Sequence, residues 1–254
     1  MRRIVKIRET VLGDGVPKIC IPVTAANQTE LQEQVRKALD GPCDLLEWRA
    51  DFFGTCDAAE IQAQLFADTL KFLRAEIGER PLIFTFRTKE EGGERSVTPE
   101  AYKELNLSVA STGLADLIDV ELNRGEALLT ELTGKLHEKG MAVIGSFHDF
   151  TGTPSQEKIT EILCRMQNCG VDLTKAAVMP KSEPDVLALL SASVEMKMKY
   201  ADRPFITMSM GRLGAVSRLA GSLTGSALTF ATAGRASAPG QLAAAQVAGL
   251  LPQL

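Results

Sequence analysis

A single lysine, Lys175, lies within a largely apolar stretch at residues 171–180. The stretch has the length of one strand, and apolar residues on both sides of the lysine are typical of a strand covered on both faces in a parallel sheet. Burial disfavours a charged ammonium, yet at the reference pKa of lysine the neutral amine costs roughly 4.6 kcal/mol at pH 7. Because a neutral amine attacks ketones and forms Schiff bases, Lys175 is a candidate nucleophile. The alternative is a lysine whose ammonium reaches solvent.

The chain has only two histidines, and their predicted positions differ. His137 falls in the last turn of a predicted helix, where a solvated imidazole interacts favourably with the helix dipole. His148 falls at the end of the predicted strand before the lysine strand, and histidine titrates nearest neutrality. It is therefore the candidate base that removes a proton beside a lysine imine and returns one to a departing hydroxyl. A structural histidine is the alternative, and Glu91, Glu90 or Glu94 would orient the ring.

Eight predicted strands, each followed by a predicted helix, carry these residues. The strands are predicted at residues 18–23, 45–49, 82–87, 117–121, 142–147, 171–180, 205–209 and 227–230, and the helices at 29–39, 58–77, 98–111, 126–139, 155–169, 184–200, 212–220 and 241–251. Strands that alternate with helices form a parallel sheet, and eight such units predict an α/β fold, the (β/α)₈ barrel. A doubly wound open sheet is the alternative, but the chain lacks the glycine fingerprint after its first strand. We expect residues 1–254 to form one barrel domain, with residues 1–16 as an N-terminal β-hairpin and Thr29 as the first helix cap.

The composition excludes several classes of function. The chain is 45% hydrophobic and 24% charged with a net charge of −4, so it is an ordinary globular protein without the basic field that nucleic acids attract. No apolar run reaches the length of a membrane span, and the N-terminus lacks the apolar core of a signal peptide, so we expect a cytoplasmic protein. Five cysteines without a Cys-x-x-Cys pair predict reduced thiols rather than zinc or disulfides. No nucleotide-binding loop is present.

Polar residues at the carboxyl ends of the strands, where such barrels place their chemistry, suggest the substrate. The loops after the last two strands carry a guanidinium, a hydroxyl and an amide, which suit a carboxylate; these are Arg218, Ser237 and Gln241. The opposite side offers groups suited to hydroxyls, namely Glu47, Arg49 and Arg87. A small polyhydroxy keto-acid is the implied ligand. Structural ion pairs, such as Arg49 with Asp51 or Arg87 with a loop glutamate, are the alternatives.

Eight stretches together resemble one known family. They are Glu47-Trp48-Arg49, Phe84–Arg87, Glu91–Glu94, His148–Phe150, Lys175 with Val178–Pro180, Thr207–Gly211, Ser217–Gly221 and Ala236–Gln241. None is specific alone, but together they resemble the type I 3-dehydroquinate dehydratases, Schiff-base enzymes of the shikimate pathway. One departure is Pro22 near the end of the first strand, where some members carry a serine that touches substrate.

The resemblance implies a barrel with a hairpin across its bottom, usually as a homodimer. It implies that the protein dehydrates 3-dehydroquinate to 3-dehydroshikimate, a step of aromatic amino acid biosynthesis, without metal or external cofactor. Lys175 would form the imine, His148 would act as general base and acid, and Glu91 would be its partner. The implied substrate-binding residues are Glu47, Trp48, Arg49, Arg87, Arg218, Ser237 and Gln241.

Two other functions are compatible with the same residues. A Schiff-base aldolase would cleave a carbon–carbon bond instead of releasing water, although its anion site usually receives a phosphate. A barrel retained only for ligand binding would show no turnover. Product analysis separates these three functions.

Overall fold

The computed structural model describes residues 3–54 and 59–253. Residues 1–2 of the expected hairpin, Cys56, the first residue of the helix expected at 58–77, and residue 254 lie outside the described residues. The other four cysteines, Cys20, Cys43, Cys164 and Cys169, are free thiols, as expected.

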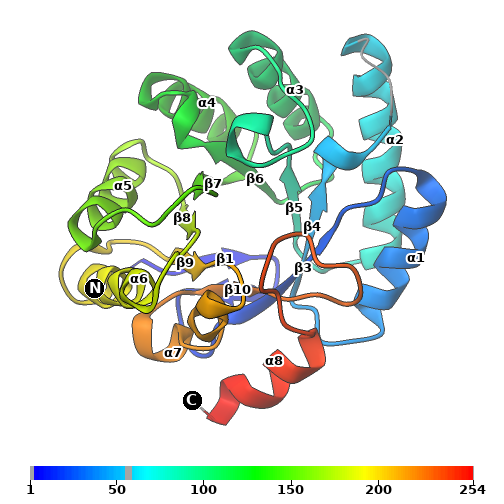
Figure 1. Cartoon of the computed structure of the whole chain (residues 1–254). Coiled ribbons are helices and arrows are strands. Elements are labelled where there is room, and N and C mark those ends of the chain that lie inside the picture. Colours follow the sequence, from blue (N-terminus) through cyan, green and yellow to red (C-terminus); the bar gives the residue numbers. More distant parts are fainter. Residues whose placement is uncertain (1–2, 55–58, 254) are drawn as a thin grey trace.

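Eight parallel strands form one sheet that nearly closes into a barrel (Figure 1). They are β3 (Lys18–Val23), β4 (Leu45–Arg49), β5 (Leu82–Thr85), β6 (Leu117–Glu121), β7 (Ala142–Asp149), β8 (Leu173–Val178), β9 (Phe205–Ser209) and β10 (Leu228–Phe230). The strands pair in the order β10-β3-β4-β5-β6-β7-β8-β9. At the seam between β9 and β10, the backbone amide of Ala227 donates to the carbonyl of Phe205 at 2.8 Å. The predicted (β/α)₈ architecture is confirmed.

Helices surround the sheet and connect successive strands (Figure 1). They are α1 (Gln28–Leu39), α2 (Ala59–Ile77), α3 (Pro99–Ser111), α4 (Glu126–Glu138), α5 (Gln156–Asn168), α6 (Glu183–Glu195), α7 (Gly221–Thr224) and α8 (Ala244–Leu250). The cap expected at Thr29 is wrong. Asn27 caps α1 instead, because its side chain accepts a hydrogen bond from the amide of Glu30.

Other predicted boundaries also differ from the structure. Strand β5 ends at Thr85 because the chain turns into a 3₁₀ segment, Lys89–Glu91. Helix α6 ends at Glu195 and continues as a π-helical turn. The short helix expected at 212–220 is a 3₁₀ segment, Leu213–Arg218, which α7 follows. Helix α8 begins at Ala244, so Gln241 belongs to the preceding loop.

The strands separate two apolar layers, because alternate side chains point to opposite faces of a sheet. One layer lies between the strands and the helices. The other fills the lower barrel, where the N-terminal hairpin of β1 (Val5–Ile7) and β2 (Thr10–Leu12) packs against inward residues such as Leu45 and Leu173. Arg8 secures this hairpin through an ion pair of 2.7 Å with Asp116. The lower end of the barrel is thus closed. On β8, the side chains at every second position from Leu173 also point inward.

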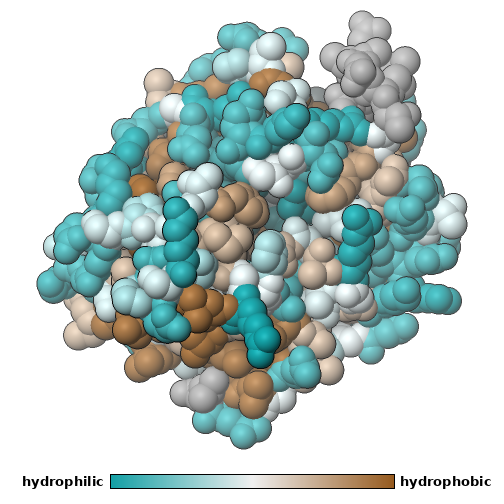
Figure 2. Space-filling model, viewed as in Figure 1, coloured by the Kyte–Doolittle hydropathy of each residue, from teal (hydrophilic) through white to brown (hydrophobic). Residues whose placement is uncertain are grey.

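The outer face of α6 and α7 exposes apolar side chains. Leu187 on α6 is 61% exposed, Leu223 on α7 is 71% exposed, and Met198 in the π-helical turn is 74% exposed. Figure 2 shows hydrophobic residues gathered over this part of the surface. Isolated exposed apolar residues are common, whereas contiguous ones mark contact surfaces. We call these three residues the α6–α7 face.

Candidate active site

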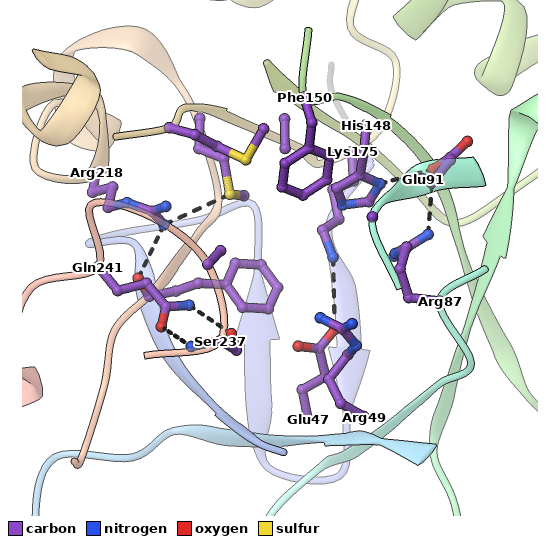
Figure 3. A pocket seen from close by; sticks show the side chains of 16 residues that line it. Glu47, Arg49, Arg87, Glu91, His148, Phe150, Lys175, Arg218, Ser237 and Gln241 are labelled. Atoms are coloured by element: carbon purple, nitrogen blue, oxygen red, sulfur yellow. Dashed lines mark hydrogen bonds and ion pairs between the residues drawn. The ribbon is translucent and has the colours of Figure 1, made fainter. Parts of the chain in front are cut away.

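A pocket lies at the carboxyl end of the strands and contains all but one of the predicted site residues (Figure 3). The space between its lining residues, including open solvent at the mouth, is about 460 Å³. The predicted residues that line it are Glu47, Arg49, Arg87, Glu91, His148, Lys175, Arg218, Ser237 and Gln241. The barrel therefore brings together residues from six strands and their loops, as expected for this fold.

Trp48 is the predicted residue that does not line the pocket. It follows Glu47, which points inward, so its own side chain points to the outer face of β4. There it is completely buried, and its ring contacts Phe53, Phe66 and Phe84 edge-on with centroid distances of 5.6, 5.2 and 5.7 Å. The expectation that Trp48 contacts substrate is corrected: it packs the core between the strand and the helices.

Lys175 is buried inside the barrel, with only 4% of its surface exposed. Its Nζ atom lies 3.2 Å from Oδ2 of Asp119 and 3.6 Å from Oε1 of Glu47. The same nitrogen lies 4.4 Å from the ring centroid of Phe230. Carboxylates at this distance and an aromatic face both favour a positive charge on the nitrogen. Burial is as expected from the sequence, but the sequence did not indicate these partners.

His148 and Glu91 form a close pair at the mouth of the pocket. Nδ1 of His148 lies 2.8 Å from Oε2 of Glu91, and the ring lies beside the Lys175 side chain in Figure 3. Burial, and then the positive charges of Arg87 and Lys175, lowers the pKa of His148 well below its usual value. Burial also raises the pKa of Glu91, against the opposing charge of Arg87. At neutral pH the imidazole is therefore uncharged and able to accept a proton.

The local fold selects Glu91 from the three candidate glutamates. The 3₁₀ segment Lys89–Glu91 ends at Gly92, which has a φ of 82°, and this turn directs Glu91 inward. Glu90 instead lies 3.4 Å from Arg124 on the surface, and Glu94 is exposed.

Gly93 allows this turn to lie close to the end of β5. The amide of Gly93 donates to the carbonyl of Thr88 at 2.8 Å. A Cβ atom at Gly93 would overlap the carbonyl of Arg87, so only glycine allows the two backbone segments to approach this closely.

Both arginines on the hydroxyl side of the pocket are held by carboxylates. Arg49 donates from Nε and Nη2 to the two oxygens of Asp51, each at 2.8 Å. Arg87 lies 3.4 Å from the loop glutamate Glu91, and also 2.8 Å from Asp119 and 3.0 Å from Glu121 on β6. The ion pairs that the sequence left open as alternatives are present, and they fix both guanidinium groups at the wall of the pocket.

Arg218 lies on the other side of the pocket and has no carboxylate within ion-pair distance among the described residues. Its guanidinium donates to the carbonyls of Phe230 at 3.2 Å and Pro239 at 3.1 Å, while Nε is buried without a partner in this part of the chain. Burial lowers its pKa to about 10, so it remains charged at neutral pH. Beside it, Gln241 donates to Ser237 Oγ at 2.9 Å. A buried cation without a counter-ion is a site for an anion.

Several residues in or beside the pocket were missed by the sequence prediction. Asp119 and Ser146 stand at inward positions of β6 and β7, and their signal was a polar residue within an apolar strand. Apolar lining residues have no such signal; they include Phe150, Met208, Met210 and Phe230.

Within residues 3–54 and 59–253, no group of three or more histidine, cysteine, aspartate or glutamate side chains is placed to hold a metal ion. No helix in the same ranges has the length and apolar character to cross a membrane.

The sequence matches the model of the type I 3-dehydroquinase family over residues 19–254. The chain belongs to the type I 3-dehydroquinase family. It is 49% identical to a 3-dehydroquinate dehydratase of Syntrophotalea carbinolica over 250 residues, which cover 97% of this chain and 96% of that protein. Family membership assigns the chain to the hydro-lyases.

Solved structures of the family share the fold closely. A type I 3-dehydroquinate dehydratase from Clostridium difficile is 44% identical, covers 100% of this chain and 98% of its own, and has a TM-score of 0.94. The Geobacillus kaustophilus protein is 36% identical, with a TM-score of 0.93 and coverage of 99% and 96%. A 3-hexulose-6-phosphate synthase, at 14% identity and a TM-score of 0.60, shares the barrel fold alone.

Proposed function

We propose that this protein dehydrates 3-dehydroquinate to 3-dehydroshikimate through an imine on Lys175. The observation that carries the proposal is the convergence, in one pocket, of a buried amine, an uncharged imidazole and an unpaired cation. The relatives are named 3-dehydroquinate dehydratases, and the Clostridium difficile relative is described with covalently modified comenic acid. The pocket supports the same covalent chemistry here.

The reaction begins when the amine of Lys175 adds to the ring ketone and water leaves, which gives an iminium ion. His148 then removes a proton from the carbon next to the iminium, because its ring is uncharged and lies beside the Lys175 side chain. The electron pair forms the new double bond as the β-hydroxyl leaves, and the imidazolium returns its proton to that oxygen as water forms. Hydrolysis of the conjugated iminium releases the product and restores the lysine.

Glu91 orients His148 in this scheme. Its Oε2 atom lies 2.8 Å from Nδ1, so the ring presents its other nitrogen, Nε2, to the substrate. In a histidine the partner of one ring nitrogen sets the role of the other. No external cofactor or metal enters these steps, since the lysine supplies the electron sink.

Two groups of residues orient the substrate. Arg218, Ser237 and Gln241 bind the carboxylate, for which the unpaired guanidinium is the main determinant. The ring hydroxyls face the opposite wall, which consists of Glu47, Arg49 and Arg87. Pro22, which replaces the serine of some relatives, supplies no hydroxyl at the end of β3.

Borohydride trapping during turnover tests the proposal. Reduction of the iminium in the presence of 3-dehydroquinate, followed by peptide mass analysis, should place the ligand adduct on Lys175. An adduct on Lys181, or no adduct during turnover, would contradict the covalent mechanism. Formation of two carbon fragments instead of water and 3-dehydroshikimate would indicate an aldolase.

We also propose that the protein acts in the cytoplasm as a homodimer of single-domain chains spanning residues 1–254. The α6–α7 face supports self-association because it exposes Leu187, Met198 and Leu223 together. One chain has a mass of 27.4 kDa, and light scattering coupled to gel filtration should give twice this value for the native protein. The double variant L223K/M198K should give the mass of one chain. A native protein with the mass of one chain would contradict the dimer. Cell fractionation checks the location.

A further inference from the structure

Asp119 on β6 is a buried carboxylate that neither the resemblance nor the pocket assigned to the reaction. Its side chain is 1% exposed. Oδ1 accepts hydrogen bonds from Arg87 at 2.8 Å and from Ser146 at 2.6 Å. Oδ2 lies 3.2 Å from Nζ of Lys175. Two donors thus anchor one oxygen, and the other is directed at the amine.

The charge on the Lys175 nitrogen explains why a fixed carboxylate is useful there. An ammonium ion and a ketone condense to an iminium ion and one water molecule, so the nitrogen carries one positive charge both before and after condensation. It is neutral only while it attacks the carbonyl. A carboxylate beside the nitrogen therefore stabilises the resting amine and the iminium alike, and the iminium must stay protonated to withdraw electrons from the adjacent carbon.

Asp119 remains ionised in these surroundings. Burial alone raises its pKa, but the positive charges of Arg87 and Lys175 outweigh burial, and the pKa lies below its usual value. A carboxylate with a lowered pKa is a poor proton acceptor, so Asp119 keeps the proton on the lysine nitrogen rather than removing it.

We propose that Asp119 is a further catalytic residue, the counter-ion that holds the positive charge on the Lys175 nitrogen in the resting enzyme and in the iminium. The inference rests on the proposed imine mechanism. The other ionisable groups around the amine come from the neighbouring strands and their ends; they are Cys20 on β3, Glu47 and Arg49 on β4, Arg87 after β5 and His148 on β7. Of these, only Glu47 is a second carboxylate near Nζ, and it is farther away than Asp119.

Carbamoylation by cyanate measures the charge on Lys175 without substrate. Cyanate is small enough for the pocket, and only a neutral amine adds to it to give a urea, which peptide mass analysis locates. In D119N the ammonium loses its nearer counter-ion, so the pH at which Lys175 reacts half-maximally should fall by about 1 to 3 pH units relative to the native protein. The exposed Lys71 serves as the internal reference in each digest.

Turnover gives the second readout. The kcat of the D119N protein should fall by about 10- to 1,000-fold. The reason is that the iminium loses its counter-ion, and each pKa unit of lost stabilisation lowers the rate tenfold. If Asp119 merely held Arg87 in place, kcat would fall while the cyanate profile of Lys175 stayed where it is in the native protein. That unchanged profile would overturn the proposal.

The matched variant E47Q tests the ranking of the two carboxylates, and it also serves if D119N does not fold. It leaves Asp119 in place, so its cyanate profile should stay close to the native one. A shift of one pH unit or more in E47Q would make Glu47 the counter-ion and overturn the assignment. Borohydride trapping at Lys175 tests the imine itself, so failure of the proposed function and failure of this inference give different results.

Discussion

Nδ1 of His148 and Oε2 of Glu91 lie 2.8 Å apart although the two residues come from different strand ends. The contact fixes the orientation of the imidazole ring, and burial keeps it uncharged. The base is therefore ready before substrate arrives, and a glutamate rather than solvent determines which ring nitrogen faces the pocket.

Replacing His148 separates imine formation from proton transfer. H148A should still form the borohydride-reducible adduct on Lys175, because the amine and its carboxylate partners remain. Its kcat should fall by about 10² to 10⁴-fold, the usual contribution of a general base. The reduced adduct should still carry the β-hydroxyl of the substrate, so it should be one water heavier than the adduct formed after dehydration.

The other histidine provides the control. His137 lies 2.7 Å from Asp172 near the closed end of the barrel, so H137A should keep native kcat. Failure of H148A to form any adduct would show that His148 also takes part in condensation.

The pH dependence of kcat/KM should reflect the lowered pKa of His148. The reaction needs the uncharged imidazole, and activity is lost only as the pH falls through the pKa of the free enzyme. Because that pKa lies below 6.5, the acidic limb of the profile should lie below pH 6.5. Since His148 and Glu91 lie 2.8 Å apart, the limb should report the ionisation of the two groups together. A midpoint at or above pH 6.5 would contradict an uncharged resting imidazole.

Replacing the lysine should abolish turnover while leaving the anion site intact. K175M should lose roughly 10⁴ to 10⁶-fold in kcat, as other enzymes do without their nucleophile. Calorimetry should still detect 3-dehydroquinate binding, because Arg218 and Gln241 are unchanged. K181M, which changes a lysine next to the same strand end, should retain native kcat. Substantial turnover by K175M would exclude the covalent route.

Arg218 should increase the affinity for substrate without increasing the free energy of unfolding. R218M removes a charge-assisted contact to the carboxylate, so KM should rise by about 10- to 100-fold. The same change removes a buried cation that has no carboxylate partner in the described chain, and methionine fills similar space. The free energy of unfolding should therefore stay equal or increase. Urea denaturation beside steady-state kinetics measures both, and a large loss of stability would show that Arg218 is structurally required.

The turn that carries Glu91 should not tolerate a larger residue at its second glycine. In G93A the new methyl group would overlap the carbonyl of Arg87, so the turn must shift and move Glu91 away from His148. We expect kcat to fall by about 10² -fold, as for a displacement of about 1 Å. G134A is the matched control, since Gly134 lies within α4 with open space around it. There alanine should stabilise the helix by up to about 1 kcal/mol.

The sequence predicted the strands well because buried parallel strands are short, largely apolar runs between turn residues, as β5 and β9 illustrate. Such runs are apolar on both faces, so they do not reveal which residues face inward. Trp48 was placed in the pocket on the family resemblance, and the inward position of its strand neighbour Glu47 corrects this.

Contacts between side chains of non-adjacent elements could not be predicted from the sequence. From the sequence, three glutamates in one loop were equivalent candidates for the partner of His148. The structure distinguishes them because the 3₁₀ turn directs Glu91 inward. The pairing of Lys175 with Asp119 depends on the curvature of the barrel, which lets Nζ of Lys175 on β8 lie 3.2 Å from Oδ2 of Asp119 on β6 although β7 lies between the two strands.

The hairpin of β1 and β2 has a kinetic consequence. Val5, Ile7 and Leu12 seal the lower barrel, and Arg8 fastens them to Asp116. Ligands consequently exchange through the upper mouth, where the loop bearing Ser237 and Gln241 lies. Incoming 3-dehydroquinate and departing 3-dehydroshikimate must use the same passage in turn, so accumulated product should act as a competitive inhibitor.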